Sequence, residues 1–461
     1  MGHSIGALLL AAAGGAVWGL CFGREPLSLA SWAALAPLVL LLGHRRAPLL
    51  GWLHGTVFWA VSISWIAPTL ETFGGLPRPL AIALTAGLCA FLGLYHLAFA
   101  WLGRPLWRRG GALAFVALPA LWVALEWLRT YAVSGFPWNL AAYAWVDVPG
   151  ALPLAAWVGA FGISYLLVLA NTGIAAAVAR RRWTAAAVPL FIPLFLLPVA
   201  GRWSRSWAAD APDPSVFAGA GPPARPFRIL QPNISNLVAF DRVAVERNYR
   251  KVLALSHAAC DRGSLLVWPE SAAWPFGYGR DRFLAADVAA LARRGCTVLL
   301  NSVHEEGASY YNSVFLVAAG RPAVRYDKRH LVPFGEYVPL QGVFSFMDSL
   351  ARNAGDFSAA ERLVLLPWDG ERLGVAICFE VIFPAEVAEL ARAGATVLVT
   401  VTNDAWYGDT FAPWQHLRAA RFRAAETRRP MLRAAITGVS ALIAPDGSVR
   451  AQLGVFEEGV I

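Results

Sequence analysis

Three side chains that can act together in acyl transfer lie where short apolar runs of the C-terminal half end. Glu270 closes "SLLVWPE", Lys328 lies in "YDKRHLVPFGEYVP", and Cys378 follows "LGVAI". A thiol is mostly protonated at neutral pH, so it needs a base, and a carboxylate whose pKa is raised by burial can serve. A lysine beside them favours the thiolate and, later, an oxyanion. Glutamate, lysine and cysteine therefore make a complete set for nucleophilic acyl transfer without a histidine.

Each of these residues also has a purely structural interpretation. A cysteine in a strand is more often a small buried apolar residue than a nucleophile. Glu270 alone could cap a helix, and Lys328 could belong to a solvated charge cluster. Competing constellations fit less well, because "GVSAL" around Ser440 lacks the second glycine of a nucleophile elbow and His416 suits a structural role. The five cysteines leave at least one thiol free and show no Cys-x-x-Cys spacing, so we expect no metal and no cofactor.

The elements that must position these residues fall into two halves of different composition. The chain has 461 residues, of which 57% are hydrophobic and only 15% charged, and the long uncharged runs lie within residues 1–203. A membrane-spanning helix needs about 20 apolar residues. The sequence therefore predicts a transmembrane domain over residues 1–201 with about seven helices. Their expected positions are 5–22, 27–43, 50–68, 80–103, 111–128, 151–178 and 184–201.

The arginines between these segments predict the orientation in the membrane. The loops after the second, fourth and sixth segments hold eight arginines: Arg45, Arg46, Arg104, Arg108, Arg109, Arg180, Arg181 and Arg182. The alternate loops hold three: Arg24, Arg78 and Arg129. Basic loops stay cytoplasmic, so the C-terminal half is expected on the periplasmic side of a bacterial inner membrane. Arginine clusters of this kind contribute to the net charge of +9. Because no nucleic-acid-binding motif is present in the sequence, we expect no nucleic-acid partner.

The C-terminal half has the pattern of a layered α/β domain. Residues 202–226 are rich in Ala, Pro and Gly and predict a linker. From residue 227 to 461, β-rich runs such as "FRILQPNI", "CTVLLNSV" and "ATVLVTVTND" alternate with helical stretches. This alternation predicts a sheet covered by helices.

Several motifs taken together resemble one family. "WPES", "YDKRHLVPFGEYVP" and "ICFE", in this order and at these spacings, resemble the Glu–Lys–Cys triad of the nitrilase superfamily. "SGFPWNLAAYAW", "VTNDAWYG" and "PWQHLRAARFRAAETRRP", behind several apolar segments, resemble its membrane branch, the apolipoprotein N-acyltransferases. The resemblance covers nearly the whole chain. It implies a helical transmembrane bundle followed by a nitrilase-like αββα sandwich.

The resemblance also implies roles for individual residues. Glu270 would be the general base, Lys328 would stabilise the oxyanion, and Cys378 would carry the acyl chain as a thioester. Glu336 in "FGEYVP" and Glu380, two places after the nucleophile, would support this triad. The implied acyl donor is a phospholipid such as phosphatidylethanolamine, and the implied acceptor is the α-amine of a diacylglyceryl-cysteine at the start of an apolipoprotein.

The chain departs from the family pattern at three points. Phe379 stands where the family usually has tyrosine, and Phe240 stands where it often has tryptophan, so we expect altered substrate packing rather than lost chemistry. The family also has a final spanning helix, and the sequence ends at Ile461 before one, so either the sequence is truncated or this last span is absent. We expect this to affect stability and the position in the membrane more than catalysis. The aromatic residues expected at the lipid entrance, with core packing as the alternative, are Trp274, Phe276, Trp406, Tyr407 and Trp414.

Two other functions agree with parts of the sequence. A membrane-tethered amidase of the same fold would use the same triad with water as the acceptor. A transporter with an inert sensing domain would instead place polar residues deep in several spans, where only Glu126 and Arg129 approach such positions. The family resemblance favours acyl transfer over both.

Overall fold

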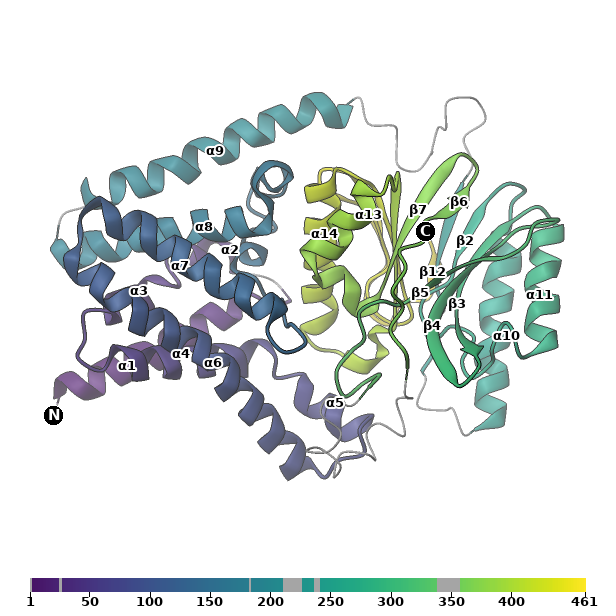
Figure 1. The fold of residues 1–461 in the computed structure, drawn as a ribbon, viewed down its shortest axis with the longest axis horizontal. Coiled ribbons are helices and arrows are strands. Elements are labelled where there is room, and N and C mark those ends of the chain that lie inside the picture. Colours follow the sequence, from purple (N-terminus) through teal and green to yellow (C-terminus); the bar gives the residue numbers. More distant parts are fainter. Residues whose placement is uncertain (1, 25–26, 182–183, 210–225, 236–240, 338–356) are drawn as a thin grey trace. The chain divides into compact units, whose positions relative to one another are not determined.

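The computed structural model describes residues 2–24, 27–181, 184–209, 226–235, 241–337 and 357–461 (Figure 1). The chain forms two compact units. The helical unit consists of Met1–Thr72, Leu76–Ser206 and Thr410–Arg418. The sheet unit consists of Phe73–Gly75, Trp207–Asp409 and Ala419–Ile461.

Helices form wherever the sequence predicts a span. The α-helices of the helical unit are α1 Gly2–Leu20, α2 Ser28–Ser31, α3 Ala36–Leu41, α4 Ala47–Ser62, α5 Ile66–Thr72, α6 Arg78–Arg109, α7 Gly111–Tyr131, α8 Ala151–Arg180 and α9 Thr184–Ala209. Within the described residues, four segments are long and apolar enough to cross a membrane, and α4 with α5 forms a fifth candidate bent by 52°. Ile5–Leu20 and Leu29–Leu41 are shorter. A count of seven spans therefore remains a prediction.

A buried asparagine explains why the span predicted over 27–43 is broken. Asn171 of α8 accepts hydrogen bonds from the backbone N–H groups of Leu35 and Ala36, at 2.9 and 3.1 Å. Its amide nitrogen donates to the carbonyl of Ser31 at 3.0 Å. The backbone groups freed between α2 and α3 are thus satisfied by a side chain, as an apolar setting requires.

The helical unit holds more buried polar side chains than the sequence analysis recognised. His54 of α4 and His96 of α6 are both buried, and their Nδ1 atoms lie 3.1 Å apart. Arg129 donates to the carbonyl of Trp138 at 2.7 Å, and Glu126 accepts from the N–H of Ala141 at 2.7 Å. These bonds tie the helices to the segment "SGFPWNLAAYAW", so several of the buried polar groups serve the packing of the unit itself.

The boundary between the two units differs from the predicted one in two ways. Helix α9 continues to Ala209, so a helix covers the start of the stretch predicted as a linker, while residues 210–225 lie outside the described residues. The first turns of α14 (Ala412–Thr427) belong to the helical unit. There Gln415 donates to the carbonyls of Phe22 and Ser62 at 3.1 and 2.8 Å and accepts from Trp138 Nε1 at 2.7 Å.

The sheet unit contains two six-stranded sheets, in the orders β12-β1-β2-β3-β4-β5 and β11-β10-β9-β8-β7-β6. The strands of the first sheet are β1 Phe227–Gln231, β2 Leu265–Val267, β3 Thr297–Glu306, β4 Ser309–Val317, β5 Val324–Asp327 and β12 Gly459–Val460. Those of the second are β6 Leu366–Trp368, β7 Glu371–Ile377, β8 Val397–Thr402, β9 Met431–Ala435, β10 Ala441–Ile443 and β11 Val449–Gln452. Helices α10 Arg242–Ala259 and α11 Arg282–Arg293 cover the first sheet, and α13 Pro384–Arg392 and α14 cover the second (Figure 1).

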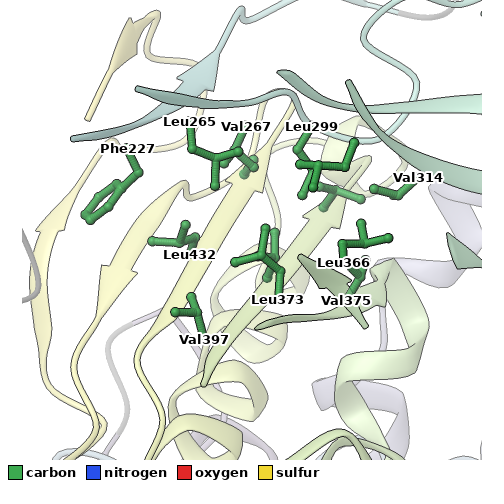
Figure 2. Close-up of a cluster of buried hydrophobic side chains, with 14 of the residues drawn as sticks. Phe227, Leu265, Val267, Leu299, Val314, Leu366, Leu373, Val375, Val397 and Leu432 are labelled. Carbon is green, nitrogen blue, oxygen red and sulfur yellow. The ribbon is translucent and has the colours of Figure 1, made fainter. Parts of the chain in front are cut away.

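Alternating side chains of the strands build the core. Leu265, Val267 and Leu299 point between the sheets, where they meet Leu373 and Val397 of the second sheet (Figure 2). Their neighbours Leu266, Val298 and Leu300 point to the other face and pack in the layer of α10 and α11. This period of two is the expected pleat of a strand buried on both faces. The predicted αββα sandwich is confirmed.

A disulfide that the sequence analysis did not predict joins Cys260, at the end of α10, to Cys296, just before β3. Cys21, Cys89 and Cys378 are not disulfide-bonded.

Removing this disulfide is expected to destabilise the sheet unit. The cross-link closes a loop with a sequence separation of 36 residues, and chain entropy alone predicts a loss of about 3–4 kcal/mol in the free energy of unfolding. Denaturant unfolding of Cys260→Ser/Cys296→Ser, followed with and without reductant, measures it. The double variant should not respond to reductant, and a wild-type protein equally indifferent to reductant would contradict the prediction.

Candidate active site

The three predicted catalytic residues follow three strands that come from both sheets. Glu270 follows β2, Lys328 follows β5, and Cys378 follows β7 and begins the 3-10 turn η4 (Cys378–Ile382). Cys378 has a φ of 51°, in the left-handed region that a side chain rarely adopts. Such a conformation costs about 1–3 kcal/mol and persists only where surrounding contacts enforce it. The nucleophile candidate therefore sits on a sharp, strained turn.

Glu380 supplies the contacts that enforce this turn. It accepts from the backbone N–H groups of Ile377, Arg329 and His330 at 2.6, 2.7 and 3.1 Å. The hydroxyl of Tyr326 donates to the same carboxylate at 2.9 Å. Burial raises the pKa of Glu380 to about 7, against the opposing effect of Lys328 and these N–H groups. Glu380 thus ties the segment that carries Lys328 to the turn that carries Cys378, which is a positioning role.

A buried ammonium lies between two buried carboxylates. Lys328 Nζ lies 2.9 Å from Glu336 Oε2 and 3.8 Å from Glu270 Oε1, and the lysine is 1% exposed. Burial disfavours the charged ammonium, but Glu336 and Glu270 outweigh it and hold the pKa of Lys328 above its usual value. Lys328 is therefore a fixed positive charge inside the site.

The pKa of the Glu270 carboxyl and the pKa of the Cys378 thiol are both raised. Burial raises the pKa of Glu270, Lys328 lowers it and Glu336 raises it. Burial also raises the pKa of Cys378, with Glu270 acting in the same direction and Lys328 in the opposite one. Glu270 and Lys328 therefore act on the pKa of the thiol in opposite directions. The thiol is protonated at rest and needs the base to become a nucleophile.

Two asparagines missed by the sequence analysis hold the carboxylates. Asn312 Nδ2 donates to Glu270 Oε1 at 2.9 Å and to Glu336 Oε1 at 2.8 Å. Asn301 Nδ2 donates in turn to Asn312 Oδ1 at 2.7 Å. A primary amide has two N–H bonds, so one asparagine can serve both carboxylates. The sequence feature that could have indicated this role is an asparagine inside each of two apolar runs, "VLLNSV" and "YYNSVF".

Replacing Asn312 by alanine should move the pH dependence of the site. The amide hydrogen bond lowers the pKa of Glu270, so its loss raises that pKa. Cys378 needs ionised Glu270 as its base, so the acidic limb of the pH–rate profile should shift to higher pH. Activity should fall most at low pH and recover as pH rises. Rates of Cys378 acylation measured from pH 5 to 9 test this, and a uniform loss at every pH would contradict it.

The described residues among those predicted to bind substrate belong to both units. Trp274 is 45% exposed, and Trp406 is 37% exposed with its ring 4.5 Å from that of Phe73. Burial raises the pKa of Tyr407, and Cys378 raises it further. Trp414 belongs to the helical unit, where Arg24 lies over its ring. Phe240 lies outside the described residues.

Two predicted aromatic positions have structural roles. The ring of Phe276 is partly buried and packs edge-on against Tyr249 and Phe283, and a place at the lipid entrance stays a prediction for this residue. Phe379 is 6% exposed and packs against Phe383 and His330. The aromatic face expected at position 379 is therefore used for packing beside the turn.

Comparisons with known proteins define first the class and then the family. Residues 228–461 match the carbon-nitrogen hydrolase domain, and residues 14–173 match the apolipoprotein N-acyltransferase N-terminal domain. The chain is 34% identical to the apolipoprotein N-acyltransferase of Geobacter metallireducens and 36% identical to that of Methylococcus capsulatus, in both cases over 98% of this chain and 88% of the relative. The chain belongs to the apolipoprotein N-acyltransferase family.

Solved structures are similar to part of the chain. A CN-hydrolase superfamily protein from Xanthomonas campestris covers 51% of this chain and 88% of its own length, with 17% identity and a TM-score of 0.40. The family assignment rests on the sequence relatives and the domain matches.

Proposed function

We propose that this protein moves an acyl chain from a phospholipid to the α-amine of the diacylglyceryl-cysteine that begins an apolipoprotein. The observation that carries the proposal is that Lys328 lies 3.8 Å from Glu270, while the consecutive residues Thr402 and Asn403 contact Cys378 and Glu270. It is supported by relatives named apolipoprotein N-acyltransferase along nearly the whole chain. Phosphatidylethanolamine is the proposed donor.

The first half-reaction forms a thioester. Glu270 takes the proton of Cys378, and the thiolate attacks the ester carbonyl of the phospholipid. Lys328 and a backbone N–H near Phe379 stabilise the oxyanion. The carbon–oxygen bond to glycerol breaks, and Glu270 returns the proton to the departing lysophospholipid.

The second half-reaction forms the amide. The α-amine attacks the thioester carbonyl and passes a proton to Glu270. The carbon–sulfur bond breaks, and the thiolate of Cys378 recovers its proton from Glu270. Donor and acceptor use the same site in turn, so ping-pong kinetics are expected.

The helical unit gives this chemistry access to lipid-anchored substrates. Large apolar side chains of its spanning helices are exposed, including Trp101 and Phe191, both at 64%. Both substrates carry acyl chains, which can stay in the bilayer if the reaction takes place at its surface. The excess of basic residues in alternate loops and the Cys260–Cys296 disulfide support the periplasmic side of a bacterial inner membrane.

A trapping experiment tests the proposal. Purified protein is incubated with phospholipid labelled in its acyl chain and quenched with acid. Wild type should carry a hydroxylamine-labile label, and Cys378→Ala should carry none. Adding a diacylated lipopeptide should then yield labelled triacylated product. Label retained by Cys378→Ala would refute the assignment of the nucleophile, and release of free fatty acid alone would identify a hydrolase.

A further inference from the structure

A hydroxyl group outside the proposed triad touches the reactive sulfur. Thr402 Oγ1 lies 3.3 Å from Cys378 Sγ, and Thr402 is fully buried. The strand register explains the contact, because β7 and β8 are parallel with Ile377 beside Val401. Cys378, the residue after β7, therefore lies beside Thr402, the last residue of β8. The contact joins the end of β8 to the turn that begins at Cys378.

The same hydroxyl has a second, stronger partner. Thr402 Oγ1 lies 2.7 Å from Asp404 Oδ1. The other oxygen of Asp404 accepts from Arg433 NH2 at 2.6 Å, and this ion pair is fully buried. A Cβ atom on Gly438 would lie 2.1 Å from Asp404 Oδ2, so the carboxylate is also held against the backbone. Asp404 is therefore a fixed acceptor that keeps a partner when Thr402 turns away.

A threonine hydroxyl carries one proton, so it can donate to only one of these two acceptors at a time. While the sulfur is a thiol or a thioester it is a weak acceptor, and the carboxylate holds the proton. Once the sulfur is a thiolate it accepts a charge-assisted hydrogen bond, which is roughly twice as strong as a neutral one. The charge on the sulfur thus decides which way the hydroxyl points.

We propose that Thr402 is a catalytic residue whose hydroxyl donates to Cys378 Sγ whenever that sulfur is negatively charged and returns to Asp404 otherwise. For acyl transfer this rests on the proposed function. The thiolate occurs twice there, as the attacking group in the first half-reaction and as the leaving group in the second. No bond to Thr402 forms or breaks, and its proton stays on the hydroxyl throughout.

The neighbouring residue gives the end of β8 a second role. The N–H of Asn403 donates to Glu270 Oε2 at 2.9 Å. Two consecutive residues therefore contact the base and the nucleophile, one through the backbone and one through a side chain. The charged and titratable groups acting on the thiol are Glu270, Lys328, Asp404 and Tyr407, and the last two belong to the same 3-10 turn, Asp404–Tyr407. Thr402 is neutral, so its replacement leaves all of these charges in place.

Alkylation of Cys378 by iodoacetamide tests the proposal without any lipid substrate. The full-length protein in detergent is labelled between pH 7 and 9, and the Cys378 peptide is quantified by mass spectrometry. Below the pKa of the thiol, the rate follows the thiolate fraction. Thr402→Val keeps the shape of the side chain but removes the donor, so its rate should fall about tenfold at every pH, a shift of one pKa unit in the thiol. Thr402→Ser should stay within about twofold of wild type.

Thr400→Val is the matched control, because Thr400 is a fully buried threonine two residues earlier on the same strand. Its alkylation rate should equal that of wild type. The proposal fails if Thr402→Val is alkylated at the wild-type rate, or if Thr402→Ser is as slow as Thr402→Val. Melting temperatures identify misfolding, and if Thr402→Val does not fold, Thr402→Ala takes its place.

The alkylation rate of Thr402→Val tests the hydrogen bond to the sulfur independently of the proposed acyl transfer. A slower alkylation of Thr402→Val supports the hydrogen bond to the sulfur even if the protein transfers no acyl chain. Unchanged alkylation refutes it even if acyl transfer is observed. In a protein that transfers acyl chains, Thr402→Val should also slow the formation of the Cys378 thioester by a similar factor, with Thr400→Val again unaffected.

Discussion

Replacing Glu270 by glutamine should lower the rate of Cys378 acylation about 10³-fold, within the range that general acid–base catalysis contributes. Glutamine has almost the same shape but cannot take the thiol proton. The pKa of the thiol is raised by burial, so little thiolate forms without the base. Single-turnover labelling with an acyl-labelled phospholipid measures the effect.

The matched control for this variant is Glu246→Gln. Glu246 is an exposed residue of α10 paired with Arg250, so the same change there should leave acylation unchanged. Removing a buried carboxylate also changes the local charge, so the melting temperature of Glu270→Gln has to be compared with that of wild type. A folded Glu270→Gln protein that acylates within tenfold of wild type would exclude Glu270 as the base.

Replacing Lys328 by methionine should damage both activity and stability. The loss of one charged oxyanion partner is expected to slow acylation by about 10²–10³-fold. Breaking a buried ion pair by removing one partner costs about 3–5 kcal/mol, because Glu270 and Glu336 remain buried without their counter-charge. Lys328 also lowers the pKa of Glu270 and of Cys378, so the remaining activity should require a higher pH.

A second variant separates the two effects of Lys328. Lys328→Met/Glu336→Gln removes one positive and one negative charge together, so stability should recover in part while acylation stays low. Recovery of acylation in this double variant would show that Lys328 acts only through the charge balance. Lys251→Met, which breaks the partly exposed Lys251–Glu458 pair, is the stability control and should cost about 0–1 kcal/mol.

Much of the sheet unit could be predicted because its strands are apolar and bounded by polar motifs. β7 and β8 were recognisable from "LGVAI" and "VLVTVT", and the residues proposed for catalysis follow such runs. The strands that were not predicted are very short or lie in sequence that resembles a helix. β12 has only two residues, and β9 lies within "RRPMLRAAITG", whose composition is that of the preceding helix. Short strands exist because of their pairing partners, which no local pattern reveals.

The supporting residues of the site were only partly predictable. Glu336 and Glu380 stand in motifs beside the proposed triad, so the family resemblance pointed to them. Asn312 and Thr402 stand in ordinary strand sequence, and their roles depend on contacts between distant segments. Asn312 meets Glu270 across 42 residues, and Thr402 meets Cys378 across 24.

The amino-acid sequence by itself determined which side chains are available for chemistry, the alternation that builds two layers of sheet, and the apolar length of the spanning helices. These are local properties of side-chain type and spacing. Only the tertiary structure decided that Asn171 closes a broken span, that Cys260 bonds to Cys296, and that Asn312 and Thr402 reach the base and the nucleophile. Each of these contacts depends on how segments far apart in the chain pack together. For Asn312 and Thr402, which lie on strands, a shift of one residue in the strand register would turn the side chain to the opposite face of the sheet.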